Sequence, residues 1–313
     1  MENTVSTMPS RPGQPGRELA RQARPVLATP GPFRGLVLAL GLILGLILGI
    51  ILGQGRPALA GGMDLAVAGF EAGRQGRHQE AVTLLSRAIN STELSLDNLV
   101  AALNNRGLAY SRLDRLDLAL ADFGRAIRIR PGDPALYLNR AKALRAKARY
   151  DEALADLDRA VALSPGEPAP LALRADFHEN LRHYEKALAD YEAVVRARPD
   201  LAGSYVNRAA VLRKLGRVQE ALADYDRAIE LEPGKADFHY NRGIARTTLN
   251  DQPGALADFD QAVRLNPGSA VSWYRRGLVR KSLGQVEQGQ KDVEKALQIH
   301  RGVAAEAQVG EAP

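Results

Sequence analysis

The chain of 313 residues contains no cysteine, and only 5% of it is aromatic. The lack of cysteine excludes disulfide bonds and thiolate metal sites, and it leaves the redox compartment open. Residues 1–61 carry six arginines and two glutamates, so the rest holds 36 basic and 34 acidic side chains. Because this remainder is close to neutral, charge gives no support to nucleic-acid binding.

The sequence also lacks the usual motifs of enzymes and metalloproteins. It contains no phosphate-binding loop, no G-x-S-x-G and no H-E-x-x-H. Its five histidines are scattered rather than clustered at metal-ligand spacing: His78, His178, His183, His239 and His300. We therefore expect no enzymatic activity and no metal or other cofactor.

Two segments precede the part of the chain that predicts a fold. Residues 1–34 contain six prolines and five arginines without apolar periodicity, which predicts a disordered basic arm. Residues 35–55 include GLVLALGLILGLILGIILG, which carries no charge. As a helix this run would span roughly 28 Å, close to the hydrocarbon thickness of a bilayer.

The apolar segment has two interpretations, and its length slightly favours the first. It is either an uncleaved transmembrane anchor or the core of a signal peptide cleaved after Ala60, since Ala58-Leu59-Ala60 is an A-x-A site. Five arginines precede it and only Arg56 follows closely, so the amino end should stay cytoplasmic. We expect the rest of the chain outside the cytoplasm, either membrane-anchored or exported to a compartment such as the periplasm. The mass of the protein from its own cell separates the two interpretations.

Glycines on the apolar segment suggest a second property. Four of them recur at every fourth position: Gly41, Gly45, Gly49 and Gly53. Small residues at this spacing allow two membrane helices to approach closely. The segment could therefore support self-association, although glycine is also common in membrane segments generally.

From residue 62 onward the sequence repeats itself with a regular period. Alanine marks this period at Ala119, Ala153, Ala187, Ala221 and Ala255, and proline does so at Pro131, Pro165, Pro199, Pro233 and Pro267. A large apolar residue follows each alanine after four positions: Phe123, Leu157, Tyr191, Tyr225 and Phe259. These positions share one face of a helix, and the proline ends that helix. The glycines directly after four of the prolines should allow a sharp turn: Gly132, Gly166, Gly234 and Gly268.

This pattern resembles the tetratricopeptide repeat, a helix–turn–helix unit of about 34 residues with small residues at positions 8, 20 and 27. The resemblance implies an all-α, right-handed solenoid of about seven repeats over residues 62–303, with a groove on its inner side. The expected units are 62–95 (degenerate), 100–133, 134–167, 168–201, 202–235, 236–269 and 270–303, followed by a disordered tail at 304–313. The last unit departs from the pattern at Gly289, where alanine is expected. About four extra residues around Thr92–Asn98 should lengthen the first turn between units.

An arginine recurs at position 7 of every unit except the first, and an aspartate recurs at position 23. A buried arginine needs a partner, so we predict six structural ion pairs. These are Arg106–Asp122, Arg140–Asp156, Arg174–Asp190, Arg208–Asp224, Arg242–Asp258 and Arg276–Asp292. The first unit has Ala68 and Leu84 at these positions, and this joint loss favours pairing within units. The alternative is a solvated surface pair of little energetic value.

The resemblance also implies which residues face the groove. Position 6 is Asn105, Asn139, Asn207 and Asn241, with Leu173 and Arg275 interrupting the series. An amide can pair with the main chain of an extended peptide, although it could also be a polar filler. The other groove positions supply Arg112, Lys142, Arg145, Arg213, Lys214, Tyr240, Tyr274 and Lys281, against Asp176, Glu179 and Asp237.

These residues predict a net basic groove that suits extended, acidic or carboxylate-ended segments of other proteins. We therefore expect a protein–protein interaction scaffold or adaptor, with no role in binding nucleic acid. The alternative is a structural assembly factor that organises a membrane complex through self-association of its glycine-faced helix.

Overall fold

The structure is a computed structural model that describes residues 61–310 as backbone and the side chains as far as Arg301. Fourteen α-helices lie in this range. They are α2 (Gly62–Arg74), α3 (His78–Asn90), α4 (Leu96–Arg112), α5 (Leu116–Ile129), α6 (Pro134–Ala146), α7 (Tyr150–Leu163), α8 (Pro168–Asn180), α9 (Tyr184–Ala197), α10 (Ala202–Lys214), α11 (Val218–Leu231), α12 (Ala236–Thr248), α13 (Gln252–Leu265), α14 (Ala270–Ser282) and α15 (Val286–Gly310).

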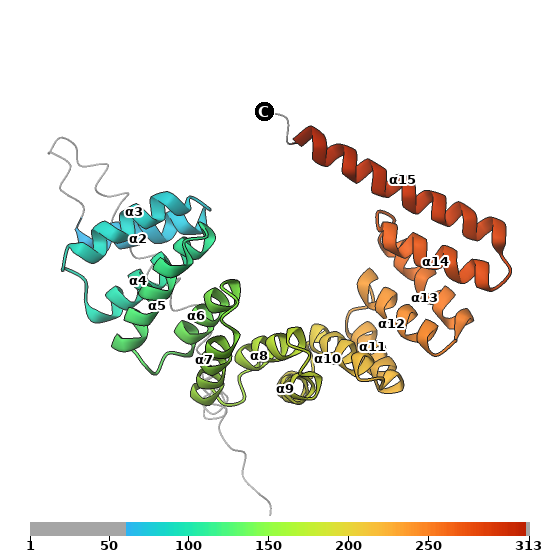
Figure 1. Cartoon of the computed structure of the whole chain (residues 1–313), viewed down its shortest axis with the longest axis horizontal. Helices are drawn as coiled ribbons and strands as arrows, with labels where there is room; N and C mark the ends of the chain where they lie inside the picture. Colours follow the sequence, from blue (N-terminus) through green and yellow to red (C-terminus); the bar gives the residue numbers. More distant parts are fainter. Residues whose placement is uncertain (1–60, 311–313) are drawn as a thin grey trace, which may run out of the picture. The chain divides into compact units, whose positions relative to one another are not determined.

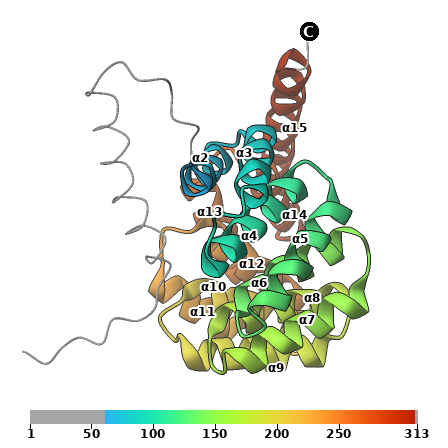
Figure 2. The same cartoon turned by 90° about the vertical axis from the view of Figure 1, so that its left-hand side faces the viewer.

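The helices form seven hairpins in sequence order, from α2/α3 to α14/α15 (Figures 1 and 2). The two helices of each hairpin pack together, and the second helix of each hairpin also packs against the first helix of the next. This arrangement confirms the predicted all-α fold of about seven repeated helical pairs. The predicted arm and apolar segment, residues 1–55, lie outside the described residues. Between residues 61 and 310, every helix is too short or too polar to cross a bilayer.

The chain turns sharply twice per unit, once inside the hairpin and once at the proline between hairpins. Position 15 has a positive φ in all seven hairpins: Gly76, Asp114, Ala148, Arg182, Gly216, Asn250 and Gly284. Of the four glycines that follow the prolines, only Gly166 adopts this left-handed conformation. A turn closed by a main-chain hydrogen bond does contain each of the four glycines, as expected, but only Gly166 uses the conformational freedom of glycine there. A glycine at position 15 avoids the steric cost that Ala148 and Arg182 carry.

The extra residues near the start of the second unit lengthen a helix, not a turn. Helix α4 has 17 residues, whereas the first helices of the other hairpins have 13. Only residues 91–95 separate α3 from α4, and Ser95 caps α4 by accepting a hydrogen bond from the Asn98 amide. Because serine is a strong N-cap, the helix starts directly after it and absorbs the insertion.

The packing of the last hairpin explains why Gly289 stands where the repeat pattern has alanine. A Cβ atom on Gly289 would lie 2.6 Å from the carbonyl oxygen of Gly277, so α14 and α15 pack backbone against backbone here. Alanine, expected at this position, does not fit. Helix α15 continues past residue 303, where the sequence predicted its end, to Gly310. The segment AAEAQ at 304–308 contains good helix formers and no proline, so nothing in it stops the helix.

A side chain near the start of the first helix holds the preceding turn in four hairpins. The residue at position 4 hydrogen-bonds to the carbonyl oxygen of the proline that ends the preceding unit. The pairs are Tyr137–Pro131, Tyr205–Pro199, His239–Pro233 and Trp273–Pro267, at 2.9–3.2 Å. These bonds satisfy main-chain carbonyls in the turns between hairpins. They therefore help to fix the angle between one hairpin and the next.

Candidate functional site

The predicted groove residues lie on the first helices of the hairpins. We call the surface formed by positions 2, 5, 6, 9, 12 and 13 of these helices the first-helix face. Neighbouring first helices contact each other at α2/α4, α4/α6 and α6/α8. Side chains from different units can therefore meet on this face, although they lie a full repeat apart in the sequence.

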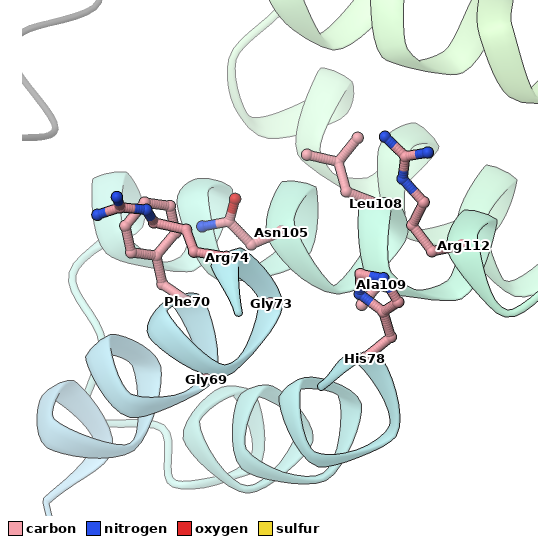
Figure 3. Close-up of a pocket in the computed structure, with 9 residues that line it drawn as sticks. All are labelled: Gly69, Phe70, Gly73, Arg74, His78, Asn105, Leu108, Ala109 and Arg112. Atoms are coloured by element: carbon pink, nitrogen blue, oxygen red, sulfur yellow. The ribbon is translucent and has the colours of Figure 1, made fainter. Parts of the chain in front are cut away.

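A recess of about 230 Å³ lies between α2 and α4 on the first-helix face (Figure 3). It is lined by Gly69, Phe70, Gly73, Arg74, His78, Asn105, Leu108, Ala109 and Arg112. The exposed lining is mostly apolar, because Phe70 is half-buried and Leu108 is 39% exposed. In Figure 3, Leu108 lies between Asn105 and Arg112 along α4, while Phe70 and Arg74 project from α2. The recess thus combines an apolar floor with polar side chains around it.

The charges around the recess are of one sign. None of its lining residues is acidic. Within residues 61–301, Arg112 has no carboxylate within 4 Å. Among the carboxylates of the same range, Arg74 reaches only Glu71, at 3.7 Å, and both side chains are about half exposed. An exposed pair of this kind is weak, so both guanidinium groups are available to an incoming anion.

The sequence predicted Asn105 and Arg112 on this face, and the structure places both beside the recess. Phe70, Arg74, His78 and Leu108 were not predicted. Phe70 and Leu108 occupy position 9, and Arg74 occupies position 13, which are groove positions in the repeat. The repeat positions of these residues could therefore have identified them as groove residues. Most of them lie in the degenerate first unit, where the repeat pattern is weakest.

Several predicted groove residues contact side chains of neighbouring helices. Asn139 donates a hydrogen bond to Asn104 of the preceding first helix at 2.9 Å. Lys214 forms an ion pair with Glu179 at 2.6 Å, and the Arg145 guanidinium lies 5.1 Å from the ring centre of Phe177. These contacts tie adjacent hairpins together. The Lys214–Glu179 pair also offsets part of the positive charge that the sequence predicted for the groove.

The remaining predicted residues differ in exposure. Asn207, Lys142, Tyr274 and Arg275 are exposed, whereas Asn241 and Arg213 are half-buried. Tyr240 packs against Phe259 with ring centres 5.8 Å apart, and Lys281 donates a hydrogen bond to Gln290 at 2.8 Å. Asp176 accepts a hydrogen bond from the Tyr191 hydroxyl. The structure does not bring these residues into one site.

All six predicted arginine–aspartate pairs meet within their own units. In each pair Nε and Nη2 of the arginine donate to the two aspartate oxygens at 2.5–3.1 Å. The aspartate side chains are only 1–8% exposed, and the arginines are 11–29% exposed. The pairs are thus partly buried rather than solvated. The hydrogen bonds to Asp122 raise the pKa of Arg106, so it stays charged.

Four of these arginines have a second partner that was not predicted from the sequence. Nη1 of Arg174, Arg242 and Arg276 donates to an aspartate of the preceding unit, at 2.7–2.9 Å. These acceptors, Asp158, Asp226 and Asp260, all occupy position 25. Arg106 reaches Ser86 at the same position. The arginine column therefore connects neighbouring hairpins as well as the two helices of one hairpin.

Sequence comparison identifies the repeats. Family models described as tetratricopeptide repeat match residues 100–133, 138–202, 172–236, 206–270 and 270–301. The chain belongs to the tetratricopeptide repeat family. Proteins of this family generally act through protein–protein interactions and are typically not enzymes. In the described part of the chain, no three His, Asp or Glu side chains are grouped to hold a metal ion.

Solved structures show the same fold at low sequence identity. A tetratricopeptide repeat protein from Parabacteroides merdae is 18% identical, with a TM-score of 0.59 over 76% of this chain and 93% of its own. MamA from Desulfovibrio magneticus RS-1 is 21% identical, with a TM-score of 0.51 over 54% of this chain and 96% of its own. These likenesses concern the fold alone. No curated protein matched the sequence.

A buried histidine in the tetratricopeptide repeats predicts a pH-dependent stability. His178 on α8 is 8% exposed and its Nδ1 has no hydrogen-bond partner among the described residues. Burial lowers its pKa from the usual 6.5, and Asp190 opposes this shift only in part. The unfolded chain therefore takes up this proton first, so the folded state should lose stability as the pH falls below about 6.5.

Replacing His178 with leucine should remove this loss of stability at low pH. Two other repeats already have leucine at the equivalent position, Leu144 and Leu212. We expect the variant to be more stable than the wild type by an amount that grows as the pH falls through about 6.5. Urea denaturation over a pH series measures it, and His300→Leu, at an exposed histidine on α15, provides the control. A stability difference between wild type and His178→Leu that does not change with pH would contradict the prediction.

Proposed function

We propose that this tetratricopeptide repeat protein is a scaffold that binds an extended segment of a partner protein along its first-helix face. The recess between α2 and α4 carries the proposal, because it combines an apolar floor with two arginines that have no strong partner. Burying a single leucine-sized side chain there would contribute about 1.5–3 kcal/mol. Charge-assisted hydrogen bonds from Arg74 or Arg112 would add orientation.

The rest of the first-helix face supports an extended ligand. Exposed polar side chains continue from the recess onto the next first helix, where Lys142 is exposed, and recur on α10 at Asn207. An extended segment offers unpaired main-chain amides and carbonyls along its length, and asparagine can pair with both. Such a segment can therefore contact several units at once, with affinity spread over many small contacts.

Site-specific crosslinking in the cell of origin tests this proposal. A photoreactive p-benzoylphenylalanine in place of Lys142, on the first-helix face of α6, should capture a partner protein. The same group in place of Arg159 provides a matched control, because this exposed residue lies on α7, the second helix of the same hairpin. Adducts from the first site alone support the proposal.

The other outcomes of the crosslinking experiment are also informative. Equal capture at both sites, or capture from α7 alone, would place the interaction elsewhere and contradict the proposal. No adduct from either site would also count against it. Adducts of this chain with itself would instead favour the assembly role that the glycine-faced segment suggests.

A further inference from the structure

We propose that the recess between α2 and α4 is the anchoring subsite of this face, and that it takes an apolar side chain flanked by carboxylates from the partner segment. The inference rests on the proposed function and names the chemistry of the partner. It depends on three features of the first two units: an open space, an apolar floor and uncompensated positive charge.

The open space exists because position 12 of the first unit is Gly73. The other units carry a side chain at this position: Ser111, Arg145, Glu179, Arg213, Thr247 and Lys281. A Cβ atom on Gly73 would meet only the Cβ of Ala81, at the ordinary distance of 3.7 Å. The helix packing therefore does not require this glycine, unlike Gly69, where a Cβ would lie 2.7 Å from Leu85. Its absent side chain leaves the recess unfilled.

The positive charge is concentrated at the same place. Position 13 is arginine in the first two units, Arg74 and Arg112, and both line the recess. Lys214 is the only other cation at position 13, and Glu179 neutralises it. The acidic groove residues Asp176 and Glu179 lie two first helices further on, on α8. An acidic segment is thus attracted most strongly to the first two units, where the position-13 cations have no strong carboxylate partner.

Together these features select for one kind of sequence. A leucine-like side chain can fill the space above Phe70 and Leu108, while carboxylates on either side reach Arg74 and Arg112. A purely acidic segment would leave the apolar floor exposed to water, and a purely apolar segment would leave the arginines unpaired. A short motif with an apolar residue between acidic ones satisfies both requirements.

A peptide-display selection tests the inference even though the partner is unidentified. The full-length chain in detergent is used to select from random displayed peptides of about twelve residues. We expect enrichment of sequences with Asp or Glu on both sides of a large apolar residue. The most enriched peptide is then synthesised with a fluorescent label, and its affinity is measured by anisotropy.

Three variants locate the binding site. The double charge reversal Arg74→Glu/Arg112→Glu should weaken binding of the selected peptide at least about tenfold. Gly73→Gln fills the recess without changing its charge, and it should weaken binding roughly tenfold while the melting temperature is maintained. Arg275→Glu, an exposed cation on the first-helix face of α14, provides the control and should change affinity less than about twofold.

The outcomes separate this inference from the proposed function. Enriched peptides without acidic residues, or affinity that falls with Arg275→Glu but not with Gly73→Gln, would overturn the inference and leave peptide binding standing. If no peptide is enriched over a library selected on detergent alone, both the inference and the proposed peptide-binding function fail.

Discussion

Replacing Asp258 with alanine is expected to lower the free energy of unfolding by about 3–5 kcal/mol, because it leaves buried positive charge without a partner. Asp258 is 1% exposed and accepts hydrogen bonds from Arg242 at 2.6 Å and from Arg246 at 2.9 Å. His239 lies 3.8 Å from the same carboxylate. Of the six paired aspartates, only Asp258 and Asp292 serve two arginines of their own unit, so their loss should be among the most costly.

Asp226→Ala provides a matched control. Asp226 binds the same Arg242 at 2.7 Å, but its side chain is 52% exposed. Solvent screens such a pair, so its removal should cost less than about 1 kcal/mol. Urea denaturation followed by circular dichroism gives both values, and hydrogen exchange should show the Asp258→Ala defect centred on α12 and α13, because each repeat contacts only its neighbours. Equal costs for the two variants would contradict a special role of the buried carboxylate.

Gly107→Ala is expected to destabilise the second repeat by about 1–3 kcal/mol, although alanine is the better helix former. A Cβ at this position would lie 2.7 Å from Cε1 of Phe123, whose side chain is fully buried. The ring fills the space that the glycine leaves between α4 and α5. Adding a methyl group therefore forces the ring or the helices to move.

The neighbouring repeat combines an alanine at this position with a smaller facing side chain. There Ala141 occupies the position of Gly107, and Leu157 occupies the position of Phe123. Adding Phe123→Leu to Gly107→Ala should recover part of the lost stability, so the double variant should be more stable than the sum of the two single changes predicts. Urea denaturation of the four proteins in this cycle measures the coupling. Strict additivity would show that the two residues do not compete for the same space.

Most of the fold could be predicted from the sequence, because each repeat is a local structure. The alanine, aromatic and proline columns define two helices and their boundary within a single unit, and the stacking of identical units follows from them. The pairing of Arg174 with Asp190 was predictable for the same reason, since both residues belong to one unit. The first unit has neither the arginine nor the aspartate, and this joint absence already indicated that the two residues pair within a unit.

The candidate site was less predictable, because it forms between units. Whether Lys214 faces a ligand or neutralises Glu179 depends on the distance between two helices from different repeats. The same is true of Asn139, whose amide binds Asn104. The sequence shows how many positively charged residues occupy the groove positions. The packing of neighbouring helices decides which of these residues lack a protein partner.

The sequence by itself determined the repeat period, the all-α architecture and the six internal ion pairs, because these depend on residues within one unit. The structure was needed to show that the insertion before the second unit lengthens α4, although the Ser95 cap that starts this helix is a local feature of the sequence. The tertiary structure also decided that Gly73 opens a recess while Gly69 and Gly289 only allow helices to touch. A glycine has no side chain to reveal its purpose, so the surrounding atoms must show whether it leaves space for a neighbouring helix or for a ligand.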